Sequence, residues 1–167
     1  MQNSKAVVTP TVMGLKLSKE DHSKNVNPTL YKSIVGSLMY LTITRLDIMY
    51  IVSLISRFME TPKETHWQET KRILRYVNGT KGYGILYSSS KNFKLIGYTD
   101  TDWARSVDDR KSTSGYVFHL RSGAISWASK KQPIVSLSTT KEEYVAATAT
   151  TCQEEWMRRM LRYLCHE

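Results

Sequence analysis

The spacing of apolar residues changes at Gly79, near the middle of this 167-residue chain. Before this glycine, apolar side chains recur every three or four residues, which is the period of a helix. After it, short segments rich in β-branched and aromatic residues alternate with turns, which is typical of strands. A helical period then returns and runs to the last residues. This order predicts an α+β fold, in which a helical part precedes strands and one long helix.

Three helices are predicted in the first half of the chain, with a break at residues 42–45. Proline is tolerated only in the first turn of a helix, so Pro62 separates the second predicted helix from the third. The third helix is predicted to end at Gly79. The residues before the first helix are polar and carry no apolar period. We therefore divide the chain into an irregular arm (1–27), a helical part (28–88) and an α+β part (89–167).

Five strands are predicted in the second half of the chain, and the third and fourth form a hairpin around a short turn that ends in Gly123. Hydroxyl side chains at 138–140 then mark the start of one long amphipathic helix. Trp67, Trp127 and Trp156 fall on apolar positions and are expected in the core. The predicted strands cover residues 84–87, 93–99, 115–120, 124–128 and 133–137.

The chain carries 24 Lys and Arg against 15 Asp and Glu, a formal net charge of +9 that suits an anionic partner such as nucleic acid. The longest apolar stretch, residues 34–59, is interrupted by charged residues, which argues against a membrane span. The first 20 residues hold no signal-peptide pattern. Cys152 and Cys165 would lie about 20 Å apart on one helix, too far to pair. We expect a reduced, intracellular protein.

Two carboxylates stand at positions where a metal site could form. Asp100 follows a predicted strand and Glu143 lies in the first turn of the long helix, so they can meet if this helix packs on the sheet. Carboxylate oxygens are the ligands that Mg²⁺ prefers, and paired Mg²⁺ ions hydrolyse phosphodiesters. The alternative for Glu143 is a capping box with Thr140, in which the glutamate accepts a backbone N–H. Asp100 could simply end a strand.

Longer motifs run through both halves of the chain: YKSIVGSLMYL (31–41), RLDI (45–48), SRFM (56–59), HW (66–67), RILRY (72–76), GYTDTDWA (97–104), DRKSTSGYVF (109–118), SW (126–127), SKKQ (129–132) and LSTTKEEY (137–144). These motifs resemble the Pol polyprotein of copia-type retrotransposons, from the end of the reverse transcriptase into the ribonuclease H domain. The resemblance implies a ribonuclease H-like fold that cleaves the RNA strand of RNA–DNA hybrids with Mg²⁺. It also implies that Asp100 and Glu143 are metal ligands.

The chain departs from this family at Leu46, Arg105 and Lys141, where the family has proline, glycine and an acidic residue. In a ribonuclease H fold, three antiparallel strands and a helix are followed by a parallel strand that carries a further carboxylate. No residues follow Glu167 to supply it. We therefore expect a truncated ribonuclease H domain with an incomplete catalytic set and little or no activity.

Nucleic acid is the partner that the resemblance implies, and four side chains are candidates to touch it. Lys71, Arg72 and Arg75 form a basic helix face, which could equally be solvated, and Trp103 could stack on a sugar or base, although burial is favoured.

A weaker resemblance concerns the secreted RxLR effectors of oomycetes, which act on targets inside host plant cells. Arg72, Ile73, Leu74 and Arg75 fit the pattern Arg-x-Leu-Arg of their translocation motif. A pseudogene product without a selected role is the third alternative.

Overall fold

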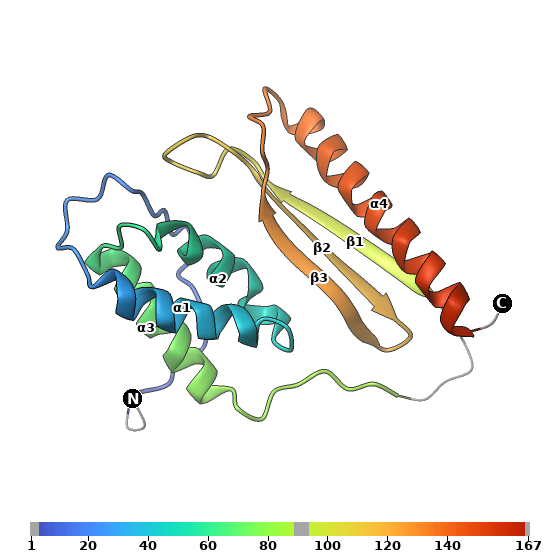
Figure 1. Ribbon diagram of the computed structural model, residues 1–167, viewed down its shortest axis with the longest axis horizontal. Coiled ribbons are helices and arrows are strands. Elements are labelled where there is room, and N and C mark those ends of the chain that lie inside the picture. Colours follow the sequence, from blue (N-terminus) through green and yellow to red (C-terminus); the bar gives the residue numbers. More distant parts are fainter. Residues whose placement is uncertain (1–3, 89–93, 166–167) are drawn as a thin grey trace. The chain divides into compact units, whose positions relative to one another are not determined.

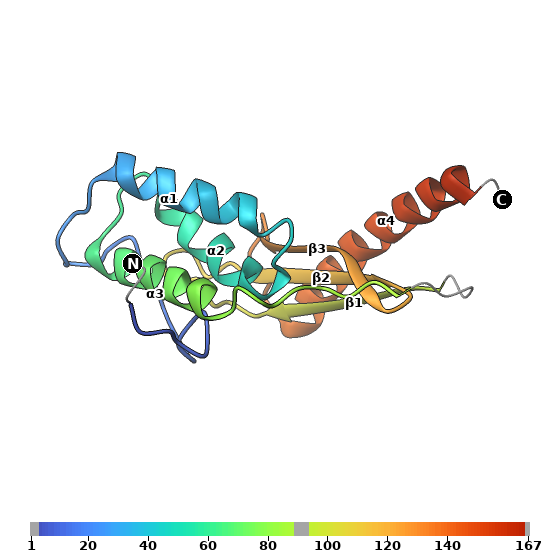
Figure 2. The ribbon, with the colours of Figure 1, turned by 90° about the horizontal axis from the view of Figure 1, so that it is seen from below.

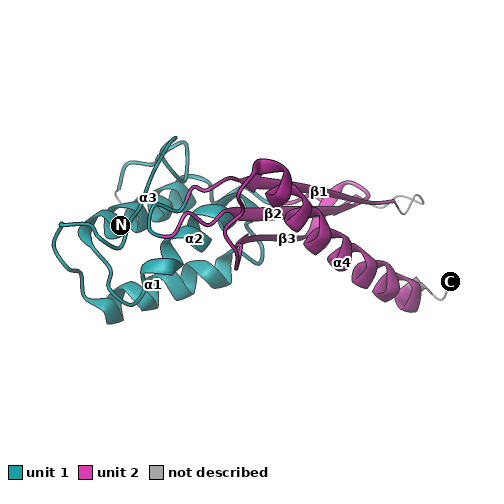
Figure 3. Cartoon of the chain, turned by 90° about the horizontal axis from the view of Figure 1, so that it is seen from above, with its two compact units in different colours: residues 1–84, 106–108 teal, residues 85–105, 109–167 magenta. Residues whose placement is uncertain are grey.

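The computed structural model describes residues 4–88 and 94–165 (Figure 1). These residues contain four α-helices and one three-stranded antiparallel sheet, so the predicted α+β class is confirmed. The chain divides into two compact units (Figure 3). The first comprises residues 1–84 and 106–108, and the second comprises residues 85–105 and 109–167. Among the described helices, none has the length and apolar character needed to cross a membrane.

The first unit contains the three predicted helices, α1 (Pro28–Leu41), α2 (Met49–Ile55) and α3 (Glu64–Gly79). The break predicted at residues 42–45 is present, and short 3-10 turns flank α2 on both sides. Asn27 caps α1, because its side-chain oxygen accepts the backbone N–H groups of the second and third helical residues. The Asn27 side chain therefore fixes where α1 begins.

Apolar faces of all three helices form the core of the first unit, together with Leu17 from the N-terminal arm. Tyr31 of α1 is fully buried, and its hydroxyl donates to the backbone oxygen of Ile55 at 2.9 Å. Its phenol thus has a partner, which removes the cost of burying an unpaired polar group. The other core residues are Val35, Leu38, Ile48, Ile51, Val52, Ile55, Phe58, Ile73 and Tyr76.

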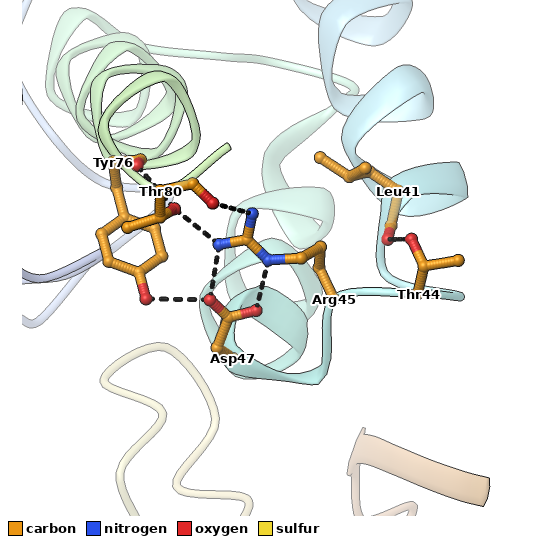
Figure 4. Close-up of polar contacts among 6 residues, drawn as sticks. All are labelled: Leu41, Thr44, Arg45, Asp47, Tyr76 and Thr80. Carbon is orange, nitrogen blue, oxygen red and sulfur yellow. Dashed lines mark hydrogen bonds and ion pairs between the residues drawn. The ribbon is translucent and has the colours of Figure 1, made fainter. Parts of the chain in front are cut away.

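The Arg45 side chain connects the α1–α2 turn to the C-terminal end of α3 (Figure 4). Its guanidinium makes two bonds to the Asp47 carboxylate, at 2.9 and 2.7 Å, and two bonds to Thr80, one to the hydroxyl and one to the backbone oxygen. The Tyr76 hydroxyl donates to the same carboxylate at 2.8 Å. Arg45 lowers the pKa of Asp47, so the pair is ionised at neutral pH.

The second unit contains β1 (Leu95–Asp102), β2 (Thr113–Leu120), β3 (Gly123–Lys131) and α4 (Thr139–Cys165). The strands lie in the order β1-β2-β3, and α4 packs across β1 and β2 (Figures 1 and 2). Phe118 of β2 is fully buried opposite Gly97 of β1, where a Cβ would approach its ring to 2.5 Å. The predicted hairpin and long helix are confirmed.

Two predicted strands are wrong: residues 84–87 and 133–137, both within the described ranges, form no strand. The first segment packs by its side chains, since Tyr87 lies against Gly123 and its hydroxyl donates to Ala124 O at 2.6 Å. In the second, Pro133 lacks the N–H that a ladder needs. Phe93, at the start of the second predicted strand, lies outside the described residues.

The tryptophans are less buried than predicted. Trp156 is 57% exposed, so its assignment to the core is wrong. Trp67 and Trp127 are half-buried, and Trp67 packs against the core of the first unit. A single apolar residue on a long helix does not fix which side faces the sheet, and the α4 face that is covered carries Met157 instead.

Replacing Asp47 tests the Arg45 network. Asp47→Ala leaves the buried Arg45 guanidinium without its counter-charge, and we expect the free energy of unfolding to fall by about 2 kcal/mol. Urea denaturation followed by circular dichroism measures it. The matched control is Glu64→Ala in the same unit, which removes an exposed ion pair and should cost less than about 1 kcal/mol. Equal losses for the two variants would contradict a special role for this network.

Candidate functional site

A buried polar cluster lies where the first turn of α4 meets the ends of β1 and β2. Gln132 is buried, and its side-chain nitrogen donates to Ser114 Oγ at 2.7 Å and to the backbone oxygen of Glu142 at 3.4 Å. Ser112 is fully buried beside it, and its backbone oxygen accepts the Gln132 N–H at 2.8 Å. These bonds join the sheet to the start of the helix.

Glu142 points into this cluster and is fully buried. Neither of its carboxylate oxygens has a hydrogen-bond partner within the described part of the chain. Burial therefore raises the pKa of this carboxyl, against a smaller lowering by the nearby hydroxyls of Thr101 and Ser112. The negative charges of Asp102 and Glu143 add to the rise. A carboxylate in this position is costly when ionised.

Glu143 is exposed, and its capping alternative is wrong. The N-cap of α4 is Ser138, whose hydroxyl accepts the Lys141 N–H at 3.3 Å and whose backbone oxygen accepts the Glu142 N–H. A capping box would place its glutamate three residues after the cap, which is the position of Lys141. Glu143 therefore lies one residue beyond the capping position, with its side chain free to face a ligand.

Asp100 lies on the face of the sheet that α4 leaves uncovered. Thr101 and Ser114 are register partners, and both face α4, through Glu142 and Gln132 respectively. Successive side chains of a strand point to opposite faces, so Asp100 points away from the helix. The structure thus places Asp100 and Glu143 on different surfaces, both exposed.

The described residues contain no group of three or more His, Cys, Asp or Glu side chains able to hold a metal ion. Mg²⁺ needs several oxygen ligands that converge on one point. Within the described part of the chain, Asp100 and Glu143 lie on different surfaces and do not converge on one point. The proposed roles of the two carboxylates stay predictions.

Glu142 is the carboxylate that sequence reasoning missed. Its signal was available, because Glu142 and the buried Ala146 are four residues apart and Met157 follows on the same side of α4. This spacing places Glu142 on the apolar side of the helix, where a charged residue is unexpected.

Trp103 lies directly after β1 and is 51% exposed, so the expected burial is wrong. The turn that carries it is held by an ion pair between Arg105 and Asp102 at 2.8 Å. Ala104 has φ 47° there, and its N–H donates to Ser112 Oγ at 3.0 Å. A tight turn thus presents the indole to solvent beside Asp100 in the sequence.

The basic face of α3 is partly neutralised by its own unit. Lys71 lies 3.8 Å from Glu64 and over the Trp67 ring. Arg72 donates to Thr9 Oγ1 at 2.9 Å. Burial raises the pKa of Glu69, while the charges of Arg72 and Arg75 lower it. The three cations are therefore only in part available to a phosphate.

The Arg-x-Leu-Arg pattern lies in the middle of α3, at residues 72–75. Ile73 is fully buried in the core and Leu74 packs against it. Both arginines are half-buried. In the folded unit the pattern is therefore part of a packed helix, and its apolar positions are not presented to a partner.

Comparison with known proteins decides the family. The chain is 46% identical over 171 residues to the retrovirus-related Pol polyprotein from transposon TNT 1-94 of Nicotiana tabacum, covering 98% of this chain. It is 43% identical over 164 residues to the corresponding polyprotein from transposon RE1 of Arabidopsis thaliana, again covering 98% of this chain. The chain belongs to the retrovirus-related Pol polyproteins of transposons. It spans 13% and 11% of the length of these two Pol relatives.

A third relative of this Pol segment carries a different name. Secreted RxLR effector protein 161 of Plasmopara viticola is 46% identical over 128 residues, which cover 76% of this chain and 90% of that protein. No protein-family model matches the Pol segment, and no solved structure matches it. The comparisons thus support both resemblances seen in the sequence.

The unpaired carboxyl of Glu142 predicts a pH-dependent stability. The pKa of Glu142 is raised in the folded chain, so burial of the neutral carboxyl costs no ionisation energy at pH values below the ordinary pKa. As the pH rises through the raised pKa, the buried carboxyl ionises and the folded chain loses stability. Glu142→Gln should therefore stabilise the Pol segment by about 1 kcal/mol at pH 8, and the gain should shrink at pH 4.

Urea titrations at the two pH values measure this difference. The matched control is the neighbouring substitution Glu143→Gln, at an exposed position. This control should leave the stability unchanged to within about 0.5 kcal/mol. A Glu142→Gln variant that is less stable than the wild type at pH 8 would show that the ionised carboxylate has a partner in solution.

Proposed function

We propose that residues 94–165 of this Pol segment are the opening part of a copia-type ribonuclease H-like domain, and that they bind RNA–DNA hybrid without cutting it. The observation that supports this is the element order. Three antiparallel strands are followed by one long helix that packs on the first two strands. This is how a ribonuclease H fold begins.

Charge and an exposed aromatic side chain support a nucleic-acid partner. Over all 167 residues the net charge is +9, and residues 94–165 hold 11 Lys and Arg against 8 Asp and Glu, so both the chain and this part of it are basic, which favours a partner rich in phosphates. Trp103 is exposed on its turn and offers a flat surface for a sugar or base. Lys71, Arg72 and Arg75 on α3 are candidates for phosphate contacts of the first unit by itself. Such binding depends on shape and charge rather than on base sequence.

The proposal assigns Asp100 and Glu143 as inherited ligand positions for Mg²⁺. When bound in a complete site, this ion would polarise the phosphate and activate water. The two side chains present here point to different surfaces, so we derive no hydrolytic step for this segment. Binding and cleavage are thus separate expectations, and one experiment can measure both.

Fluorescence anisotropy with a labelled RNA–DNA hybrid tests binding. We expect affinity that falls steeply as the salt concentration rises, and about a tenfold loss for Trp103→Ala, since one stacked aromatic contributes about 1–3 kcal/mol. Trp156→Ala is the matched control, because this tryptophan on α4 is 57% exposed, close to the 51% of Trp103. No binding at low salt, or equal losses for the two variants, would count against the proposed interface.

The same hybrid, incubated with Mg²⁺ and resolved on a gel, tests cleavage. We expect no difference between the wild-type segment and Asp100→Asn. Robust cleavage that Asp100→Asn abolishes would overturn the proposed lack of activity and would support the inherited ligand role.

A second candidate function, a secreted effector that acts on proteins in a host plant cell, is favoured by the similarity to RxLR effector protein 161. If the Arg-x-Leu-Arg pattern directs export, then Arg72→Ala with Arg75→Ala should abolish secretion of the full chain from an oomycete host. Because Ile73 and Leu74 pack into the core of the first unit, we expect no such dependence. Residues 159–162 on α4 read Arg-Met-Leu-Arg and so fit the same pattern, and Arg159→Ala with Arg162→Ala is therefore the control. Secretion that is lost only in the first pair would favour the effector function.

A further inference from the structure

His66 is the one fully buried histidine in the described part of the chain. It lies in the first turn of α3, and its ring stacks on Phe58 with a centroid distance of 3.9 Å and an angle of 17° between the planes. A flat apolar ring on one side and burial on all sides favour the uncharged imidazole.

Both ring nitrogens of His66 have backbone partners. Nδ1 lies 3.0 Å from the Lys63 N–H, and Nε2 lies 3.1 Å from the backbone oxygen of Ser18. A backbone N–H only donates, so Nδ1 must accept and carries no proton. A backbone oxygen only accepts, so Nε2 must carry the proton. The two bonds together require the neutral ring with its hydrogen on Nε2.

The bond to Ser18 holds a segment that is anchored at a second point. The Ser18 hydroxyl and the Lys19 N–H both donate to the Asp108 carboxylate, at 2.6 and 3.0 Å. Thr65, next to His66, donates to Asp21 on the same arm. Residues 18–21 thus lie between the start of α3 and residues 106–108, all within the first unit.

We propose that neutral His66 is an acid-sensitive latch, which holds residues 18–21 and 106–108 against the N-terminus of α3 and releases them when the ring gains a proton. A proton on Nδ1 would face the Lys63 N–H, so two donors would meet and this bond would break. The Lys63 N–H and the added N–H would then both lack an acceptor inside the core.

Charged groups face the ring from three segments. Asp21 on the arm and Asp108 on the 106–108 loop favour the protonated form, and Lys63 at the start of α3 opposes it. Burial is the largest influence, and it lowers the pKa of His66 below its ordinary 6.5. The latch is therefore fully closed above pH 6.5, and its contribution to stability is lost as the pH falls toward the lowered pKa.

NMR hydrogen exchange on the full chain tests the latch. The amides to follow are Lys63, which donates to the ring, and Lys19, which donates to Asp108. After correction for the intrinsic effect of pH, we expect their protection to fall by roughly tenfold per pH unit below pH 6.5, because one proton is linked to opening. The ring signal of His66 should titrate over the same range.

The substitution His66→Gln distinguishes the effect of protonating the side chain from the effect of its hydrogen bonds on the fold. A glutamine offers one acceptor and one donor but does not titrate, so protection should become independent of pH in this range. His22→Gln, at an exposed histidine on the same arm, should behave like the wild type. The proposal is overturned if His66→Gln keeps the pH response, or if His66 titrates while both amides stay protected. Should His66→Gln fail to fold, coincidence of the ring titration with the loss of amide protection in the wild type decides.

Discussion

The bidentate ion pair between Arg45 and Asp47 connects the helices of the first unit. The α1–α2 turn carries few apolar residues that could fix it by packing, yet it must meet the end of α3. Arg45 joins the two parts, because its guanidinium bonds to Asp47 within the turn and to Thr80 just after α3. The Tyr76 hydroxyl donates a further hydrogen bond to the Asp47 carboxylate. The two bonds from the guanidinium to Thr80 are buried, where a low dielectric constant strengthens them, and the bonds to Asp47 are part-buried. The RLDI motif thus has a structural role, because it connects the α1–α2 turn to the C-terminal end of α3.

The second unit depends on α4 lying across β1 and β2, and here local chemistry and packing disagree. Phe118, Ala146 and Met157 bury apolar surface, which favours this placement. The same placement buries Glu142 without a hydrogen-bond partner. A buried carboxylate without a hydrogen-bond partner lowers the stability of the fold. Glu142 lies next to Glu143 in the sequence, one of the two carboxylates that the family resemblance proposes as metal ligands. Glu142 is thus buried, whereas Asp100 and Glu143, the carboxylates that the family resemblance singles out, are exposed.

The proposed latch at His66 in the first unit does not involve the carboxylates of the second unit. His66 is fixed by two backbone bonds and a ring stack, and none of the carboxylates proposed as ligands takes part. The arm that a polar composition marks as irregular is therefore tied down at defined points, by Leu17 in the core and by Ser18 at the latch. An isolated antiparallel bridge between Asn25 and Lys63 holds the arm at a further point.

Period and capping residues were enough to predict α1, α3, the hairpin and α4, because these features depend on neighbours a few residues away. The family motifs identified the Pol relationship and the candidate residues Asp100 and Glu143 for the same reason, since they are read from the order of residues. Only the tertiary structure decided that 84–87 and 133–137 are not strands, because a strand exists through its partner's hydrogen bonds. It also decided that Asp100 faces away from α4 and that Glu142 and His66 are buried. Those outcomes follow from sheet register and from which side of a helix is covered, and both are set by contacts between residues far apart in the chain.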